Sequence, residues 1–425
     1  TNATMVDSDG LLKWRPHNLL THSGDLTNAG WTNGALTIAT GQNDFEGNPT
    51  AFKITPTAAS AAHRFFKGSS DSNLVNGELA TITIDVKADG YNFFSIASSG
   101  NRYAIFNLSD GTVSLNTGLV SPTVTSLGNG WYRCSITSDG STQEVFSVGE
   151  TSQANTFGSQ SFTGDGTSGV LVAYPHSFRS NLGGMVNNPD TGTSYVPTTS
   201  AVVYLSRRGH HIYNGSAWVN EGILHESEAR TNLLTSSGDV TGTGWVQQIG
   251  VTSTATGSPF GSYQSASPTS TSSTEAQSYQ IGKTLASGAT YVAWSLAKYS
   301  AGNGWFSISL YDTGSANNRG WFDLKNGVVG SKDTNIIDYG MIDYGDGWWL
   351  CWASKNAGST SGGASLEVVN ANGSFDRSAA DTLLIAGSQL ELGATQSSYI
   401  STTSASATRA AETLTVPAAN LPYDS

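Results

Sequence analysis

The stretch NLLTHSGDLTNAGW (residues 18–31) recurs as NLLTSSGDVTGTGW (residues 232–245). A match of this length without a simple period is not a compositional accident, and it indicates two copies of one unit. Further matches follow in the same order, and these are FNLSDGTV at Phe106 with FDLKNGVV at Phe322, GNGWYRC ending at Cys134 with GDGWWLC ending at Cys351, and SYVPTTSA at Ser194 with SYISTTSA at Ser398. The sequence therefore predicts two tandem modules that differ by short insertions and deletions in their loops.

Each copy consists of short runs in which apolar and polar residues alternate, as in ATITIDVKA (residues 80–88) and WFSISLY (residues 305–311). This period of two is typical of half-buried strands. Asp-Gly and Asn-Gly pairs separate the runs and suit tight hairpins. We therefore expect an all-β chain of two tandem antiparallel β-sandwich domains of the jelly-roll type, with little helix.

The repeats also divide the chain into segments. The connector between the copies contains the turn pair Asn214-Gly215, and apolar residues such as Trp218 and Ile223 make it unlike a free Gly/Ser linker. The predicted segments are an N-terminal lead-in or attachment segment at 1–17, a first β-sandwich module at 18–203, an ordered connector at 204–230 and a second β-sandwich module at 231–425.

Composition excludes several classes of function. The chain of 425 residues has 20 basic and 32 acidic side chains, a formal charge of −12, and no basic cluster that would attract a polyphosphate, so nucleic-acid binding is disfavoured. No window approaches 18 apolar residues and the N-terminus lacks a signal-peptide pattern, so we expect no membrane insertion. The two cysteines, Cys134 and Cys351, occupy equivalent positions in separate copies, and we expect two buried thiols.

As a set, several segments resemble a known family. These segments are EARTNLLTSSGDVTGTGW (228–245), FDLKNGVV, GNGWYRCSIT, FTGDGTSGVLVA (162–173) and GSQLELGATQSSYISTTSASATRAAETLTV (387–416). They resemble the repeated carbohydrate-binding-type jelly-roll modules of tailed-phage structural proteins, of the head-spike or tail-fibre type. The first copy departs from this pattern at its end, where PHSFRSNLGG (175–184) replaces GSQLELG.

The resemblance implies a non-enzymatic spike or fibre subunit on the virion surface, made in the host cytoplasm, that binds a host-surface polysaccharide. It also implies contacts with other virion structural proteins and a homo-oligomer, with a trimer favoured because repetition converts weak contacts into avidity. The alternative is a purely structural decoration protein of the capsid or tail. A polysaccharide depolymerase is a third, less favoured reading, since no catalytic motif stands in the sequence.

Strand alternation sorts the candidate ligand-binding residues. In WWLCWA the core set contains Trp349 and Cys351, which leaves Trp348 and Trp352 outward. Aromatic rings flanked by polar groups are what sugar recognition needs. The alternative is that these tryptophans are buried against the connector, the other domain or a neighbouring subunit. The glycan-binding candidates are Trp294, Trp305, Tyr311, Trp321, Asp323, Trp348 and Trp352 in the second copy, and Trp131 and Arg133 in the first.

The second copy is the better candidate because its outward positions are more aromatic. We expect that no cofactor is required. The resemblance allows a structural Ca²⁺ held by loop carbonyls and a carboxylate, for which Glu391 is the candidate ligand.

Overall fold

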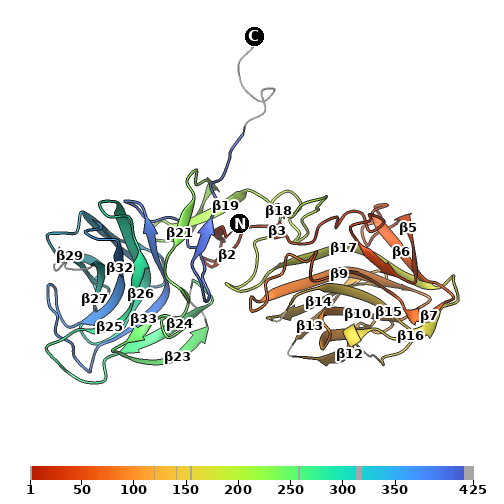
Figure 1. Cartoon of the computed structure of the whole chain (residues 1–425), viewed down its shortest axis with the longest axis horizontal. Coiled ribbons are helices and arrows are strands. Elements are labelled where there is room, and N and C mark those ends of the chain that lie inside the picture. Colours follow the sequence, from red (N-terminus) through yellow and green to blue (C-terminus); the bar gives the residue numbers. More distant parts are fainter. Residues whose placement is uncertain are drawn as a thin grey trace, which may run out of the picture. The chain divides into compact units, whose positions relative to one another are not determined.

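The computed structural model describes residues 2–118, 120–139, 141–153, 156–256, 259–312 and 318–415, and almost all of its regular structure is β-strand (Figure 1). The chain divides into two compact units. The first module comprises Arg15–Leu205, and the second module comprises Thr1–Trp14 together with Ser206–Ser425. None of the described helices is long and apolar enough to cross a membrane.

Two antiparallel sheets form the first module. Within its described residues, one sheet, named the β10 sheet, has the order β12 (Thr112–Thr117), β11 (Arg102–Asn107), β10 (Phe93–Ser99), β15 (Glu144–Gly149), β8 (Arg64–Lys67), β4 (Thr32–Gly34). The other, named the β9 sheet, has the order β13 (Ser121–Gly128), β14 (Trp131–Ser138), β9 (Ala80–Asp89), β17 (Gly169–Arg179), β6 (Ala51–Pro56), β5 (Leu36–Gln42). Short elements complete the module, and these are the pairs β3 (His17–Asn18) with β18 (Val203–Tyr204) and β7 (Ser60–Ala62) with β16 (Ser161–Thr163), and the 3-10 turn η1 (Thr156–Gly158).

The second module repeats this arrangement. Its β27 sheet, within the described part of the chain, has the order β29 (Val328–Lys332), β28 (Arg319–Asp323), β27 (Trp305–Asp312), β32 (Ser361–Val369), β25 (Ala276–Thr284), β22 (Val246–Gln247). Its β26 sheet has the order β30 (Asp338–Asp343), β31 (Trp348–Asn356), β26 (Thr290–Ala301), β33 (Thr382–Leu392), β24 (Ser262–Ser267), β23 (Gly250–Thr256). Three further pairs are β1 (Thr4–Val6) with β2 (Leu12–Trp14), β19 (Arg207–Tyr213) with β20 (Trp218–Leu224), and β21 (Arg230–Asn232) with β34 (Ala407–Arg409).

The two modules share one strand order, because each strand of the first pair of sheets has a counterpart at the same place in the second pair. Cys134 on β14 pairs with Ile84, and Cys351 on β31 pairs with Ser295 of the equivalent strand. Both thiols are buried and free. The prediction of two tandem antiparallel β-sandwiches is confirmed.

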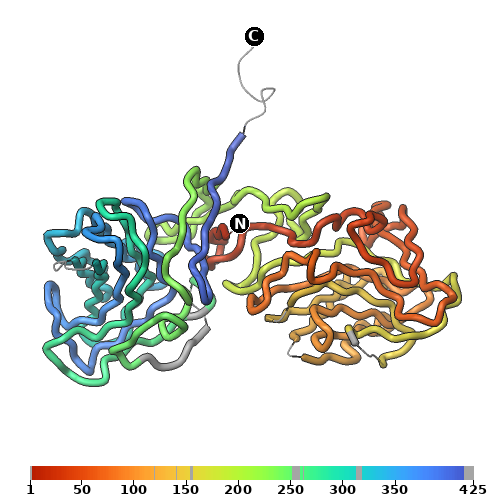
Figure 2. The backbone as a smooth tube through the Cα atoms, viewed as in Figure 1, coloured from red at the N-terminus to blue at the C-terminus, as the bar shows by residue number. Residues whose placement is uncertain are grey.

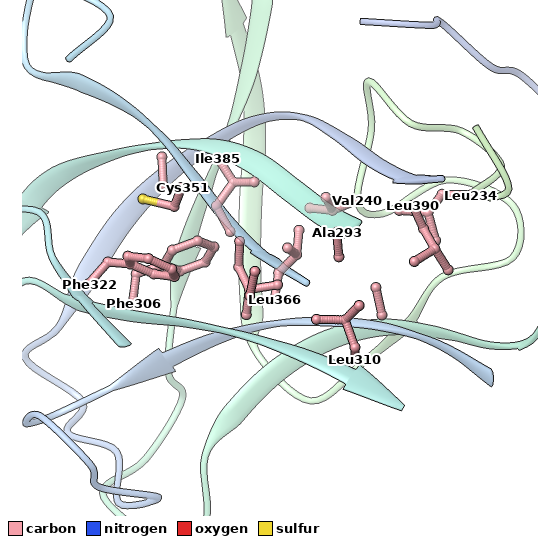
Figure 3. Packing of buried hydrophobic residues seen from close by; sticks show 14 of the residues in the cluster. Leu234, Val240, Ala293, Phe306, Leu310, Phe322, Cys351, Leu366, Ile385 and Leu390 are labelled. Atoms are coloured by element: carbon pink, nitrogen blue, oxygen red, sulfur yellow. The ribbon is translucent and has the colours of Figure 1, made fainter. Parts of the chain in front are cut away.

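Each core lies between its two sheets, where inward residues from both layers meet. In the second module, Phe306 and Phe322 come from the β27 sheet, and Cys351 comes from the β26 sheet. Figure 3 shows these three side chains together at one end of the core and Leu234 and Leu390 at the other. A buried phenylalanine of this kind contributes about 1.5–3 kcal/mol through removal of apolar surface from water.

Within each module, the two segments that are most similar between the copies lie side by side. In the first module, Asn18 donates from Nδ2 to the Val196 carbonyl at 2.8 Å and accepts from the Leu20 and Ser177 amides. In the second module, Asn232 makes the same bridge to the Ile400 carbonyl at 3.0 Å. Buried asparagines with every bond satisfied fix the local geometry, which explains why the NLLT and TTS segments change least.

The hairpin before each cysteine depends on glycine. In GNGW, Gly128, Asn129 and Gly130 have φ of 86°, 52° and 78°. In GDGW, residues 345–347 repeat this left-handed run. Glycine and asparagine or aspartate are the residues that tolerate such backbone, so the predicted hairpin turns follow directly from the sequence.

The division into units differs from the predicted one at the N-terminus and at the connector. The lead-in ends at Trp14 and packs on the second module, where the Leu12 amide donates to the Pro259 carbonyl at 2.6 Å. The connector forms the hairpin β19–β20, which also belongs to the second module. The red N-terminal trace lies beside this green hairpin in Figure 2. We name residues 4–14 and 207–224 the cover.

Arg207 fastens the cover from a fully buried position. Its guanidinium donates to the Thr4 carbonyl at 3.0 Å and forms ion pairs with Glu226 at 2.7 Å and with Glu412. These bonds join the N-terminal strand, the hairpin and the C-terminal segment. The lead-in and the connector, which were predicted as separate segments, therefore belong to the second module.

Candidate functional site

The outward tryptophans of the second copy are largely buried inside the chain. Trp294, Trp321 and Trp348 are each only 2% exposed. The Trp321 indole N–H donates to the Ser374 carbonyl at 3.0 Å, and Trp348 packs edge-on against Tyr263 with ring centroids 5.8 Å apart. The alternation correctly placed these residues off the main core, and of the two readings that the sequence left open, burial holds for these three because other parts of the chain cover them.

The remaining aromatic candidates of the second copy do not share one surface. Trp305 and Tyr311 lie half-buried on β27, whereas Trp352 lies half-buried on β31 of the opposite sheet. Asp323 is buried and holds its own turn, since its carboxylate accepts from the Lys325 and Asn326 amides at 3.1 and 3.0 Å. The second copy therefore offers no single aromatic platform of the predicted composition.

Glu391 is surrounded by hydrogen-bond donors. Its carboxylate accepts from the Ser397 amide at 2.8 Å, from the Ser397 hydroxyl at 2.6 Å and from the Trp294 indole at 3.4 Å. Calcium needs several oxygen ligands, so these surroundings do not fit a calcium site. Across the described ranges, no group of three or more His, Cys, Asp or Glu side chains is placed to hold a metal ion.

The outer face of the β26 sheet is apolar and lies beneath the cover. On this face Leu296 of β26 stands opposite Leu350 of β31. A cavity lined by Leu350 and Trp294 of the sheet is also lined by Met5 and Trp218 of the cover. This face therefore serves as an internal packing surface in the second module.

The equivalent face of the first module carries charge instead. Here Asp85 of β9 stands opposite Arg133 of β14, and the guanidinium donates from Nε and Nη2 to the two carboxylate oxygens at 2.7 and 2.8 Å. Burial raises the pKa of Asp85, and the hydrogen bond with Arg133 opposes that shift. Arg133 is half-buried, and its Nη1 makes no hydrogen bond with any described residue. A directed donor therefore remains at the centre of this face.

A row of aromatic rings runs beside this ion pair. Tyr174 contacts Tyr195 with ring centroids 4.8 Å apart, and His176 contacts Phe178 at 4.9 Å and Tyr195 at 6.0 Å. Tyr174, Phe178 and Tyr195 are half-buried, so each of these residues keeps some accessible surface. This row and the ion pair lie on one side of β9, β14 and β17, and we name them the first-module face.

Tyr174 is held in a strained backbone conformation. It lies in a bulge of β17 with φ of 55°, a value that bulky residues rarely adopt. Its hydroxyl donates to Asp44, which also accepts from Thr50 at 2.5 Å. Burial acts to raise the pKa of Asp44, but the hydrogen bonds from Thr50 and Tyr174 outweigh this effect and lower it. The charged carboxylate therefore anchors the ring in place.

His176 supplies a buried acceptor. Its Nε2 donates to the His17 carbonyl at 2.8 Å, which leaves Nδ1 as an unprotonated nitrogen, and Nδ1 is buried without a partner. Burial lowers the pKa of His176 to about 4, so the ring is neutral near pH 7. The buried ring therefore supports the neighbouring aromatic side chains from inside the module.

A groove of about 550 Å³ extends the same face past the loop of residues 41–47. It is lined by that loop and by Lys87, Asn129, Trp131 and Leu171. Trp131 is buried beneath Phe45 and Tyr174, so it supports the groove floor rather than offering an open ring. The volume falls in the range of known ligand sites.

Sequence reasoning found Arg133 and missed its surroundings. Asp85, Tyr174, His176, Phe178 and Tyr195 were not candidates. One signal was available, since YPHSF in the first copy replaces GSQLE in the second, and Tyr174 thereby stands where Gly387, with φ of 64°, accommodates the bulge without strain. A tyrosine in place of a left-handed glycine marks a strained position of the first copy.

Comparisons with known proteins give limited similarity. No protein-family model matches the chain, and a search of curated proteins finds no relative. Among solved structures, the tandem CBM22-1 and CBM22-2 domains of Paenibacillus barcinonensis Xyn10C match at 12% identity with a TM-score of 0.27, over 90% of this chain and 99% of that one. The enzymatically active domain of bacteriophage CBA120 tailspike protein 4 matches at 15% identity with a TM-score of 0.22, over 38% of this chain and 21% of that one. Similarities of this size leave the function to be argued from the site.

Proposed function

We propose that the chain binds a glycan on the first-module face and does not transform it. The observation that carries this proposal is the row of half-buried rings, Tyr174, Phe178 and Tyr195, beside the Asp85–Arg133 ion pair. Sugar rings present apolar C–H faces that pack on aromatic rings, and their hydroxyls need directed polar partners.

Each group has a separate task in this proposal. The tyrosine and phenylalanine rings stack against sugar rings, and the free Nη1 of Arg133 donates to ring or hydroxyl oxygens. Buried His176 packs against the Phe178 and Tyr195 rings, and Lys87 contacts the sugar that extends into the groove of residues 41–47. Asp44 and Asp85 hold the binding groups and contact no ligand themselves.

The setting we propose is the surface of a phage virion. There the chain would act as a subunit of a spike or fibre, as a homotrimer attached to other virion proteins, with a host-surface polysaccharide as its ligand. This part of the proposal rests on the resemblance of the repeated sequence segments to tailed-phage structural modules.

Glycan-array screening followed by calorimetry with the best array ligand tests the proposal. Replacing the stacking ring in Phe178→Ala should weaken binding by about 1–3 kcal/mol, by analogy with aromatic stacking on nucleobases. A matched pair controls for charge, because Lys87→Ala should weaken binding whereas Lys298→Ala, at the equivalent place in the second module, should not. If the Phe178→Ala and Lys87→Ala variants bound the glycan with the affinity of the wild type, the first-module face would be rejected as the site.

The alternative function is that of a purely structural decoration protein of the capsid or tail. This alternative predicts that the wild-type chain binds no glycan on the array while it still assembles on particles. Glycan binding by the purified chain contradicts it.

A further inference from the structure

A second cavity lies in the second module, between the cover and the outer face of the β26 sheet. Its volume is about 360 Å³, which is within the range of small-molecule sites. Strand β1, the hairpin β19–β20, strands β26 and β31 and the segment 396–399 form its walls. It is separate in chain position and in chemistry from the first-module face.

Aromatic rings dominate the walls of this cavity. Trp218 meets Tyr344 edge-on at 5.3 Å and contacts Tyr213 at 5.6 Å. On the sheet side, Tyr399 meets Phe260 at 4.5 Å. Rings in these orientations present both faces and edges, which suits a planar aromatic guest.

Two polar groups in the cavity wall have unused hydrogen-bonding capacity. His210 accepts from the Val6 amide through Nδ1 at 3.1 Å, so Nε2 carries the proton, and Nε2 has no partner among the described residues. Burial, supported by Arg207, lowers the pKa of His210 to about 4, which keeps the ring neutral. The Tyr344 hydroxyl likewise makes no hydrogen bond with a described residue, and burial raises its pKa, so it stays protonated.

The two carboxylates of the cavity wall differ in how far they are engaged. The Glu226 carboxylate pairs with Arg207 at 2.7 Å and Arg409 at 3.1 Å and accepts from the Ser398 amide at 2.8 Å. Asp343 accepts from the Gly345 amide at 2.9 Å through one oxygen, and its other oxygen can accept from a neutral donor. These two carboxylates disfavour an anionic ligand in the cavity.

We propose that the cavity binds a small uncharged aromatic molecule that carries a hydroxyl group, a ligand of the phenol or naphthol class. The ring packs among Trp218, Tyr213 and Tyr399, and the hydroxyl group bonds with His210 and Tyr344. The proposal is independent of glycan binding, because it uses none of the residues of the first-module face.

Calorimetric titration of the full chain with 2-naphthol tests it, and we expect saturable binding at one site. Tyr344→Phe removes only the hydroxyl, and His210→Asn keeps an acceptor for the Val6 amide while removing the Nε2 donor, so each should weaken binding about 3- to 10-fold. Leu350→Trp fills the cavity and should abolish binding.

The double variant Asp85→Leu/Arg133→Leu alters the first-module face and should bind 2-naphthol with the affinity of the wild type. This variant therefore distinguishes a failure of the glycan proposal from a failure of the cavity proposal. Thermal unfolding by circular dichroism shows whether each variant is folded, and binding is compared only among folded chains. The proposal would be overturned if the wild type did not bind 2-naphthol. It would also be overturned if the folded Tyr344→Phe and His210→Asn variants both bound 2-naphthol with the affinity of the wild type.

Discussion

The outer faces of the β9 and β26 sheets stand at the same place in two copies of one fold, and they differ in chemistry. In the first module the central pair is Asp85 with Arg133, and in the second it is Leu296 with Leu350. The inward residues of both sheets remain apolar, so the sandwich is unchanged. A few outward positions therefore decide whether a face carries a charged pair or receives the cover.

The bulge beside these pairs shows the same divergence. Tyr174 and His176 of the first module stand where the second module has Gly387 and Gln389. The second module adopts the left-handed bulge with glycine, and the first adopts it with a tyrosine tied to Asp44. The comparison indicates that the first copy keeps a backbone strain that packing alone does not require.

The largest expected effect is on stability beneath the cover. Leu296→Asp places an unpaired carboxylate on a fully buried face and should reduce the free energy of unfolding by about 3–5 kcal/mol. Leu296→Met is the volume-conserving control and should cost under about 1.5 kcal/mol. Urea unfolding followed by tryptophan fluorescence measures both, and an aspartate variant as stable as the methionine variant would mean that the cover does not seal this face.

The next effect concerns the ion pair at the equivalent place. Arg133→Leu leaves buried Asp85 without its partner and should cost about 1–3 kcal/mol of unfolding free energy. The double variant Asp85→Leu/Arg133→Leu copies the second module's pair and should be close to wild type in stability. A double variant less stable than Arg133→Leu alone would contradict this account of the pair.

A third effect depends on pH. The pKa of His176 falls from 6.5 when unfolded to about 4 when folded, so its neutral form stabilises the fold above pH 6.5, and that contribution is lost as pH falls toward 4. His176→Gln introduces the second module's residue and removes this titration. The stability difference between wild type and variant should therefore change by up to about 1.4 kcal/mol per pH unit between pH 6.5 and 4. A difference that is constant with pH would contradict the buried neutral histidine.

The smallest effect is on the strained tyrosine. Tyr174→Gly relieves a left-handed backbone cost of about 1–2 kcal/mol and loses contacts of similar size, so the net change in stability should stay below about 1 kcal/mol. Tyr174→Ala loses the same contacts and keeps the backbone cost. Urea unfolding should therefore find the alanine variant less stable than the glycine variant, and the reverse order would show that no strain is stored there.

The fold was predictable from the sequence because strand alternation and turn glycines are local signals. The equivalence of Cys134 and Cys351 and the left-handed turns before them followed from residues next to each other in the chain. The burial of Trp294 and Trp348 depends on residues remote in sequence, which are the cover and Tyr399 around Trp294 and Tyr263 beside Trp348, so strand alternation alone could not predict it. The tie between Asp44 and Tyr174 was missed for the same reason, since these residues are 130 positions apart.

The most direct test of the central claim is covalent footprinting of the chain with and without the glycan selected on the array, read by mass spectrometry. The account predicts protection of Tyr174, Phe178 and Tyr195 on the first-module face, with Trp305 and Trp352 of the second module labelled equally in both states. Protection of Trp305 or Trp352 with unchanged labelling of the three first-module rings would contradict it.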